Sequence, residues 1–387
     1  MKGASRGWPI VAFGDVVRQV KDKVDPETSG LERYIAGEHM DTDDLRIRRW
    51  GTIDDGYLGP AFHMRFKPGQ VLYGSRRTYL RKVAVPDFEG ICANTTFVLE
   101  PKDPTVLLPE LLPFIMQTEP FHDHSINQSK GSVNPYVNFS DLAWYEFALP
   151  PLEEQRRIVE LMQRCRELGD SIIEAAASSR ITLSALQKEY FFESQEGETL
   201  TVGDVADVRN GTTPSRSREA YWNGTIAWLP TAKVNERFIY HADECISDLA
   251  LAECSLGMIP AGSTLIAMIG QGQTRGKAAR LEIDACINQN FAAVIPKNDI
   301  DAWYLFYQLD AHYERLRSWS QGTNQHALNC SLVRDFRIRM PDISRQKEIA
   351  SVLCSVEWAA QSLERRRDSQ VAIYDLSREM HLAQKAE

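Results

Sequence analysis

The chain has 387 residues, 43% of them hydrophobic, and its 44 Lys or Arg against 53 Asp or Glu give a formal charge of -9. This length and composition allow two or three domains with substantial hydrophobic cores. The acidic total argues against indiscriminate nucleic-acid binding, so any such binding must come from local basic faces.

The first basic face is predicted at residues 46–82, which hold nine Arg or Lys against two Asp. Strand-like pieces lie at 70–73 and 82–85, and Trp50 and Tyr79 add aromatic surface. A basic stripe with interleaved aromatic side chains is typical of a nucleic-acid-binding surface. A solvated sheet surface laced with salt bridges explains the same pattern equally well, and both interpretations stay open.

A helix is predicted at 104–123, and the loop 129–135 that follows it is rich in small, hydrogen-bonding residues. Such a loop can lie along a phosphate backbone or place amide side chains against base edges, where Asn and Gln suit adenine. A plain surface turn is the alternative. The loop 320–326 occupies the equivalent place in the second half of the chain, and this recurrence favours a functional loop.

A long helix is predicted from Pro150 to about Gln195, with Glu153 and Glu154 in its first turn, where the helix dipole favours acidic residues. Apolar or small residues recur at alternating steps of three and four, as in a coiled coil. These positions are Ile158, Leu161, Cys165, Leu168, Ile172, Ala175 and Ser179. At roughly 1.5 Å per residue such a helix is about 60 Å long, which indicates a spacer.

The same plan occurs twice. A shift of 191 residues lays 341–346 on 150–155, and farther upstream 203–205 matches 14–16. The second helix repeats this line of apolar or small residues, the predicted stripe, in the same register. Its positions are Ile349, Val352, Val356, Ala359, Leu363, Arg366, Gln370 and Ile373. The chain is therefore a duplicated unit of about 190 residues, each a globular part followed by a long helix, and the period is too long for a solenoid.

The second globular part, 196–341, carries different surface chemistry. A basic, Gly/Ser/Thr-rich loop at 210–218 precedes predicted strands at 226–229 and 263–268. A second loop, 270–277, offers hydrogen-bond donors at many positions. Both halves alternate short strands, helices and loops, which predicts an α+β or mixed α/β class.

The sequence contains no complete nucleotide-binding motif. Residues 272–277 resemble a phosphate-binding loop, but Gln271 stands where a Walker A motif requires glycine and Ala278 replaces the required Ser or Thr. The dinucleotide-binding fingerprint fails as well, because Arg275 occupies the position of its third glycine.

Catalytic and metal motifs are missing too. The sequence at 134–136, Asn-Pro-Tyr, lacks the second proline of the amino-methyltransferase motif. His122 and His124 are more simply a solvated helix end than a metal site, and neither HExxH nor Gly-x-Ser-x-Gly occurs. We therefore predict a binding protein with no catalytic residue, no metal and no cofactor of its own.

Targeting features are also absent from the sequence. No apolar run approaches the length of a membrane span, and the first residues lack the hydrophobic region of a signal peptide. The seven cysteines are dispersed and form no CxxC pair, as is typical of a reducing cytoplasm. We expect a cytoplasmic protein.

Several stretches resemble the specificity subunits of type I restriction-modification enzymes. They are PPLEEQRRI at 150–158, LTVGDV at 200–205, GTTPS at 211–215 followed by Tyr221-Trp222, and the run 259–280. The similarity covers essentially the whole chain, although the second helix begins Pro-Asp-Ile-Ser and matches less well than the first.

This resemblance implies two tandem target-recognition domains, 1–150 and 196–341, each reading one half of a split DNA site. The helices at 151–195 and 342–387 would pack as an antiparallel coiled coil, give the chain a pseudo-twofold internal repeat, space the two domains and dock two modification subunits. Those subunits would bind S-adenosylmethionine and methylate adenine at N6, and restriction (motor-nuclease) subunits can join the complex.

The basic and hydrogen-bonding residues of these loops, and the starts of the two helices, are the candidate contacts. In the first domain the DNA-binding candidates are Arg46, Arg48, Arg76, Arg77, Tyr79, Lys130, Ser132 and Asn134. In the second domain they are Thr213, Ser215, Arg216, Arg218, Gln271, Thr274, Arg275, Lys277, Gln321, Asn324 and Gln325. The partner-binding candidates, at the starts of the two helices, are Glu154, Gln155, Ile158, Gln346 and Ile349.

Two alternatives belong to other classes. The first is a coiled-coil scaffold that joins proteins and never reads DNA, against which the basic loops in matching places argue. The second is a self-contained methyltransferase or nuclease, which would need cofactor or metal motifs that the sequence lacks.

Overall fold

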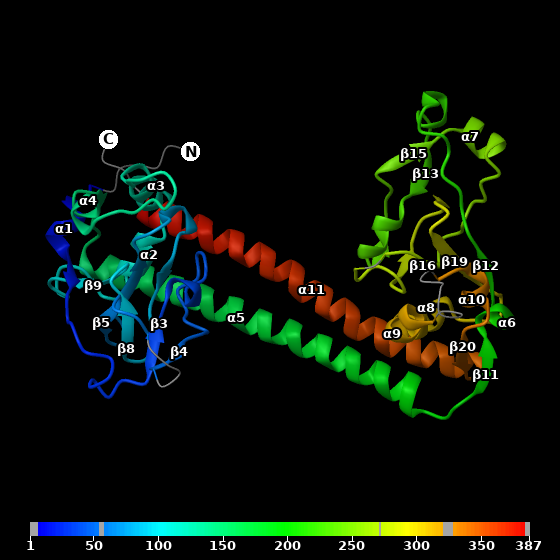
Figure 1. Cartoon of the computed structure of the whole chain (residues 1–387), viewed down its shortest axis with the longest axis horizontal. Coiled ribbons are helices and arrows are strands. Elements are labelled where there is room, and N and C mark those ends of the chain that lie inside the picture. Colours follow the sequence, from blue (N-terminus) through cyan, green and yellow to red (C-terminus); the bar gives the residue numbers. More distant parts are fainter. Residues whose placement is uncertain (1–6, 54–57, 271, 320–327, 384–387) are drawn as a thin grey trace. The chain divides into compact units, whose positions relative to one another are not determined.

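The computed structural model describes residues 7–53, 58–270, 272–319 and 328–383 (Figure 1). The chain divides into two compact units, unit 1 with Met1–Ile172 and Arg365–Glu387, and unit 2 with Ile173–Glu364. Each unit therefore combines one globular part with segments of both long helices. The division runs through the helices and not along the predicted limits at 150 and 341.

The described strands of unit 1 form three small sheets. The first is antiparallel, in the order β2 (Val17–Val20), β9 (Thr96–Pro101), β6 (Val71–Gly74), β7 (Val83–Ala84). The second has the order β4 (Gly51–Thr52), β3 (Arg33–Ile35), β8 (Gly90–Ala93), β5 (Phe62–Phe66), with β3 and β8 parallel. The third pairs β1 (Ile10–Ala12) with β10 (Glu146–Ala148).

The short helices of unit 1 correct one prediction. They are α1 (Phe13–Val16), α2 (Leu112–Met116), α3 (Glu119–Asn127) and α4 (Phe139–Ala143). The single helix predicted at 104–123 is wrong, because two helices meet at Thr118 instead. Pro113 and Pro120 each stand in the first turn of one of them, where the missing N–H of proline costs no helical hydrogen bond.

Unit 2 has the corresponding parts. Its first sheet has the order β12 (Ala206–Arg209), β19 (Phe291–Pro296), β16 (Thr264–Ala267), β17 (Ala278–Leu281), β14 (Phe238–Ile239). Two further sheets are β15 (Glu244–Ile246), β13 (Ile226–Leu229), β18 (Cys286–Ile287) and the pair β11 (Glu198–Thr201), β20 (Arg337–Met340). Its short helices are α6 (Val202–Val205), α7 (Asp248–Glu253), α8 (Ala302–Ala311), α9 (Tyr313–Ser318) and α10 (Cys330–Arg334).

The predicted duplication is confirmed by the topology of the two units. The order β12-β19-β16-β17 repeats β2-β9-β6-β7, and the parallel pair β13–β18 repeats β3–β8. A matching side-chain contact accompanies this repeat, since Lys102 Nζ donates to the Gly14 carbonyl and Lys297 Nζ to the Gly203 carbonyl. The class is mixed α and β in both units, as predicted.

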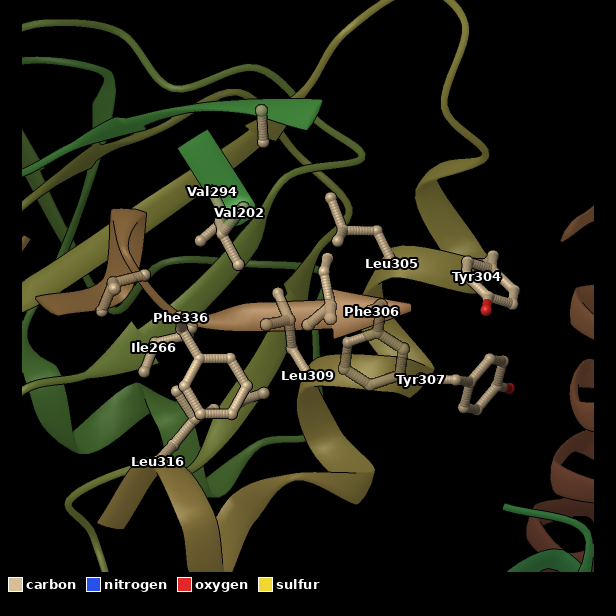
Figure 2. Packing of buried hydrophobic residues seen from close by; sticks show 14 of the residues in the cluster. Val202, Ile266, Val294, Tyr304, Leu305, Phe306, Tyr307, Leu309, Leu316 and Phe336 are labelled. Carbon is tan, nitrogen blue, oxygen red and sulfur yellow. The ribbon is translucent and has the colours of Figure 1, made fainter. Parts of the chain in front are cut away.

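The largest core lies in unit 2 and is organised by α8 (Figure 2). Tyr304, Leu305, Phe306, Tyr307 and Leu309 are all buried, because this helix is hydrophobic around most of its circumference. Each such side chain contributes roughly 1.5–3 kcal/mol on full burial. The same cluster includes residues of both long helices, so the helices are part of the core of unit 2.

The first long helix is α5 (Leu152–Lys188), continued by a π-helical turn at Glu189–Glu193, and the second is α11 (Ile343–Leu382). In each unit the two helices run antiparallel. In unit 1 the Gln370 amide donates to the Cys165 carbonyl, and in unit 2 Arg180 pairs with Glu364. None of the helices described is both long and apolar enough to cross a membrane.

About half of the positions predicted to face the partner helix are displaced by one residue. On α5, Ile158 and Cys165 face inward as predicted. The inward residues between and after them are Met162, Gly169 and Ala176, and not Leu161, Leu168 and Ala175. Leu168 is 56% exposed instead. The same displacement occurs on α11, where the inward positions are Leu353, Ala360 and Tyr374 and not Val352, Ala359 and Ile373. Adjacent apolar residues such as Leu161 and Met162 fit the average heptad spacing equally well.

Gly169 explains how closely the two helices approach in unit 1. A Cβ atom at this position would lie 2.9 Å from Oε1 of Gln370, so a larger residue would force the amide to move. Small residues at a helix contact permit such an approach.

Candidate nucleic-acid interface

A hairpin loop, residues 75–82, connects β6 to β7 in unit 1 and exposes Arg76, Arg77 and Tyr79. The backbone of Arg77 and of Arg81 is left-handed, with φ of 51° and 49°. This conformation is unfavourable for residues other than glycine, so contacts elsewhere must hold the loop in place.

A second loop, residues 128–138, supplies those contacts. The Arg77 N–H donates to the Pro135 carbonyl at 2.6 Å, and the Val137 N–H donates to the Ser75 carbonyl at 2.9 Å. The Thr78 and Ser129 hydroxyls lie 2.7 Å apart. We call the two loops together the unit 1 hairpin face. Six of the eight first-domain candidates lie on it, namely Arg76, Arg77, Tyr79, Lys130, Ser132 and Asn134.

The charges on this face are only partly neutralised. Lys130 Nζ is 2.9 Å from the carboxylate of Asp141. The Arg76 guanidinium lies 6.0 Å from the centre of the Tyr136 ring. Arg77 Nε donates to Asn134 Oδ1 at 3.3 Å. Among the described residues, neither guanidinium is paired with a carboxylate. This face therefore presents positive charge.

The other two first-domain candidates are engaged within the protein. Arg46 forms an ion pair with Asp170 of α5, and Arg48 forms one with Asp44. The alternative of a salt-bridged surface therefore holds for Arg46 and Arg48, and the nucleic-acid-binding interpretation stays a prediction for the hairpin face. The part before β5 is salt-bridged, whereas the hairpin face leaves arginines available for a ligand.

Unit 2 has a loop at the same place in its repeated sheet, between β16 and β17, of which residues 268–270 and 272–277 are described. The Leu328 N–H donates to the Met268 carbonyl at 3.2 Å, which repeats the Val137–Ser75 bond of unit 1. The candidates Thr274, Arg275 and Lys277 lie on this loop. The remaining candidates Gln271, Gln321, Asn324 and Gln325 lie outside the described residues.

A cavity of about 660 Å³ adjoins the unit 2 loop. Lys277 Nζ donates to Asn235 Oδ1 at 3.1 Å, and the Tyr313 hydroxyl donates to the Gln273 carbonyl at 2.8 Å. Arg317 on α9 also lines the cavity. Sequence reasoning missed Asn235, Tyr313 and Arg317, because they come from segments that meet the loop only in the folded chain.

The loop at 210–218 is fixed by its own charged residues. The Arg216 guanidinium lies 3.7 Å from the centre of the Trp222 ring and pairs with Glu244 at 2.6 Å. Arg218 pairs with Glu253 at 2.5 Å. These two arginines therefore stabilise the loop, and only part of each guanidinium remains for a ligand.

The two hydroxyl candidates of this loop are also hydrogen-bonded. Thr213 Oγ1 donates to Gln289 Oε1 at 2.6 Å, and the Ser215 hydroxyl lies 2.9 Å from that of Ser217. Ser215 in addition accepts a bond from the Trp222 indole through its carbonyl. The loop is thus a preformed surface and not an open chain.

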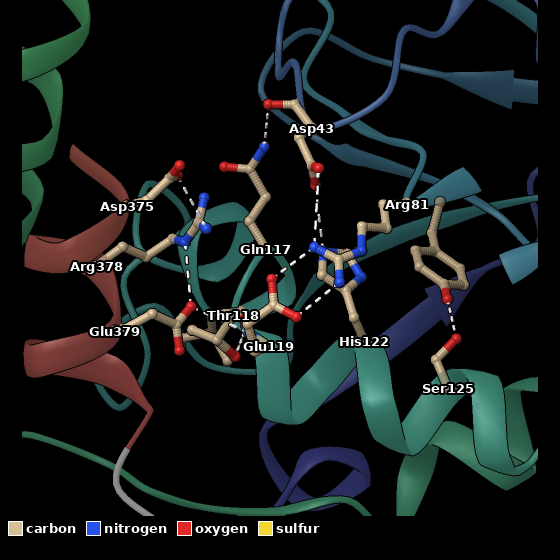
Figure 3. A network of polar contacts seen from close by, with 12 residues as sticks. Asp43, Arg81, Gln117, Thr118, Glu119, His122, Ser125, Asp375, Arg378 and Glu379 are labelled. Carbon is tan, nitrogen blue, oxygen red and sulfur yellow. Dashed lines mark hydrogen bonds and ion pairs between the residues drawn. The ribbon is translucent and has the colours of Figure 1, made fainter. Parts of the chain in front are cut away.

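The expectation of a solvated helix end at His122 is wrong. His122 is 1% exposed, and its Nε2 lies 3.5 Å from Oδ1 of Asp43 (Figure 3). Burial opposes ionisation of Asp43, but His122, Arg81 and Arg378 outweigh it and hold the pKa of this carboxyl below its usual value. The spacing of two histidines in the sequence does not reveal this burial.

The network around His122 ties the globular part of unit 1 to α11. Arg81 pairs with Glu119 at 2.5 Å, and the Glu119 N–H donates to Glu379 Oε1 at 3.0 Å. Arg378 in turn lies 3.5 Å from Glu379. Within the described ranges no three His, Cys, Asp or Glu side chains gather as they would around a metal ion.

Four of the five partner-binding candidates are buried within their own unit, so their assignment is corrected. Gln155, Ile158, Gln346 and Ile349 are each at most 3% exposed. The Gln155 amide donates to the Val106 and Pro150 carbonyls and accepts from the Leu108 N–H. These residues fix the helix starts and offer no surface to a partner, whereas Glu154 is half-buried.

The sequence matches one protein family twice, once in each half. The family is described as "Type I restriction modification DNA specificity domain", and the matches cover residues 30–180 and 195–372. The chain belongs to this family. Each match includes one globular part and most of the helix after it, in agreement with the duplication.

Related members of this family come from an archaeon and a bacterium. The type I restriction enzyme MjaIX specificity subunit of Methanocaldococcus jannaschii is 31% identical over 41% of this chain and 37% of its own length. The EcoR124I/EcoR124II specificity subunit of Escherichia coli is 24% identical over 54% of this chain and 53% of its own length. The chain thus spans about half or less of these two relatives.

Solved structures share the fold over nearly the whole chain. The S subunit of a type I restriction-modification system from M. genitalium has a TM-score of 0.66 and 12% identity, with 98% of this chain and 97% of that chain covered. The HsdS subunit of Thermoanaerobacter tengcongensis has a TM-score of 0.50 and 20% identity over 97% and 96% of the two chains. At these identities the likeness concerns the fold.

Proposed function

We propose that the chain is the DNA sequence-specificity subunit of a type I restriction-modification enzyme. Each globular part would read one half of a bipartite target in double-stranded DNA. Family membership supports this function, and one observation carries it. The loop after the third strand of the repeated sheet is basic in both units, although the two loops share little sequence.

The chemistry of the loops suits base reading. Arg and Lys bind phosphate oxygens or the acceptor edge of guanine, and Asn and Gln form paired hydrogen bonds with adenine. The unit 1 hairpin face offers Arg76, Arg77 and Asn134, while the unit 2 loop offers Lys277 beside Asn235. Unlike side chains on a duplicated scaffold are what two unlike half-sites require.

The partners in this proposal are two modification subunits docked on the long helices. In unit 1, Ile373, Leu376 and Met380 of α11 are 59%, 60% and 55% exposed. Steps of three and four residues place them on one face, away from Tyr374 and Arg378, which face inward. Exposed apolar groups that cluster in this way are typical of protein interfaces.

Catalysis would belong to the partners. In this proposal the modification subunits bind S-adenosylmethionine and methylate adenine at N6, restriction subunits can join for cleavage, and the complex acts on DNA in the cytoplasm. This chain supplies sequence selection only. Its formal charge of -9 weakens non-specific attraction to phosphates, so tight DNA binding should require the partners.

A protein scaffold that never reads DNA is the less favoured function. It would leave Arg76 and Arg77 of the unit 1 hairpin face, which pair with no carboxylate among the described residues, without a role. A scaffold would also gain nothing from holding two arginine residues in a left-handed backbone conformation.

A methylation map of the source genome, with and without this gene, tests the proposal. We expect deletion to remove methylation from one motif made of two short halves with an unread gap. An unchanged map in a host whose modification subunit is demonstrably active would contradict the proposed function and favour the scaffold.

A further inference from the structure

Val133 lies on the unit 1 hairpin face and is 91% exposed, more than any other large hydrophobic side chain in the described part of the chain. Single exposed apolar residues are common on protein surfaces and usually need no explanation. Val133 differs because hydrogen bonds close the loop that carries it and because Lys130 and Arg77 lie on the same face.

The loop that carries Val133 is closed by its own hydrogen bonds. The Lys130 N–H donates to the Tyr136 carbonyl at 2.8 Å, and the Tyr136 N–H donates to the Lys130 carbonyl at 2.9 Å. Gly131 adopts a φ of 89°, which glycine tolerates and most residues do not. The loop is therefore already ordered, and a contact made by Val133 would cost little conformational entropy.

The neighbours of Val133 suit the approach of a DNA backbone. Lys130 lies on the same loop, and Arg77 contacts the adjacent Asn134. Such cations bind phosphate oxygens and fix the register of a protein on the duplex. Once such cations hold the backbone, an apolar side chain on the same face can reach a base edge. In the major groove the apolar group on a base edge is the C5-methyl group of thymine.

We propose that Val133 contacts the C5-methyl group of a thymine in the half-site read by unit 1. This inference rests on the proposed function and adds one specificity-determining residue to it. The repeat in the sequence is consistent with a reading role, because the shift of 191 residues places Asn324 opposite Val133. An apolar side chain in one half and an amide in the other would select different base pairs.

The test uses the full chain in complex with its modification subunits and a duplex that carries the motif found in the genome. The half-site of unit 1 is identified by exchange of residues 1–150 with those of a relative. Each thymine of that half-site is then replaced in turn by deoxyuridine, which lacks only the methyl group. Binding is measured for the natural chain, for Val133→Ala and for Val106→Ala. Val106 serves as the control because it is an exposed valine (43%) that lies outside the hairpin face.

We expect the natural chain and the Val106→Ala control to lose about fourfold in affinity at one thymine, the effect of removing one buried methyl group. Val133→Ala should bind the natural duplex more weakly by a similar factor and show no further loss with deoxyuridine. Because Val133 touches the solvent over most of its surface, this variant should fold normally.

Two results would overturn the inference alone. One is equal sensitivity to deoxyuridine in Val133→Ala and in the natural chain, and the other is no sensitive thymine in this half-site. If the natural complex preferred no sequence at all, the proposed function would fail together with the inference.

Discussion

One buried glutamine amide holds the start of each long helix. Gln155 links the helix start to the Val106 and Leu108 backbone, and Gln346 does the same through the Asp301 N–H and the Pro341 carbonyl. A buried polar group without its hydrogen bonds is costly, so these amides matter more than their surface neighbours.

We predict that Gln155→Ala lowers the free energy of unfolding by about 3 kcal/mol, because it leaves backbone groups of unit 1 unpaired and creates a cavity. Denaturant unfolding of the full chain measures the effect. Gln163→Ala, an exposed glutamine on the same helix, should change stability by less than about 0.5 kcal/mol. Equal effects of the two substitutions would contradict the buried role of Gln155.

His312 makes unit 2 sensitive to acid. Burial between Phe192 and Phe336, together with the charge of Arg315, lowers the pKa of His312 to about 4. In the unfolded chain its pKa is near 6.5, so between about pH 6.5 and 4 only the unfolded state takes up this proton. Stability should therefore fall as the pH falls through this window, by about 3 kcal/mol in total.

The expected signature is a flatter stability profile for His312→Gln between about pH 6.5 and 4, measured by denaturant unfolding at each pH. His241→Gln, which removes an exposed histidine of the same unit, should keep the slope of the natural chain. An unchanged slope in His312→Gln would show that other groups cause the acid sensitivity.

At the scale of elements, a charged cluster joins three helices to one strand in unit 2. Arg237, just before β14, donates to Asp310 of α8 at 2.8 Å and to Glu357 of α11 at 2.5 Å. Gln187 of α5 donates to Asp310 at 3.1 Å. Burial disfavours the charge of Arg237, but the two carboxylates outweigh it and raise its pKa.

Replacing Arg237 by a neutral residue should lower the stability of unit 2 strongly, because the largely buried carboxylates of Asp310 and Glu357 would lose the cation between them. We predict that Arg237→Met destabilises unit 2 by about 3 kcal/mol, and that adding Glu357→Gln restores part of the loss. Arg209→Met breaks an exposed pair with Asp207 and should cost less than about 1 kcal/mol. Thermal unfolding compares the variants, and an equally mild effect of Arg237→Met would contradict the role of the cluster.

The elements also show where prediction from sequence ends. The two long helices follow directly from proline starts and heptad spacing, but the inward positions were displaced by one residue on half of the stripe. Spacing alone cannot choose between Val352 and Leu353, since both are apolar and adjacent. Packing against the globular part makes that choice, and no local pattern encodes it.

At the scale of the whole molecule, the duplication and the α/β class were predictable because the repeat leaves matching residues 191 positions apart. The candidate site was predictable in part. Basic residues are visible in the composition of the segment 46–82 and of the loop 129–135, and the structure places Arg76, Arg77 and Lys130 together on the unit 1 hairpin face. Asn235 and Tyr313 join the unit 2 site through tertiary contacts, so no local pattern marks them in the sequence.

The assembly proposed for the chain can be tested on α11. We predict that Leu376→Glu weakens complex formation with the modification subunit, because it places a charge on the proposed docking face, and that it leaves the stability of the isolated chain nearly unchanged. Val371→Glu alters an exposed apolar residue on another side of the helix and serves as the control. Equal loss of assembly in both variants would contradict the assignment of this face.

In the proposed function each globular part reads one half of the DNA target. The most direct measurement is a methylation map of cells in which residues 1–150 are replaced by those of a relative with a different specificity. We expect one half of the methylated motif to change while the other half stays the same. A motif that stays unchanged, or one in which both halves change, would contradict the claim.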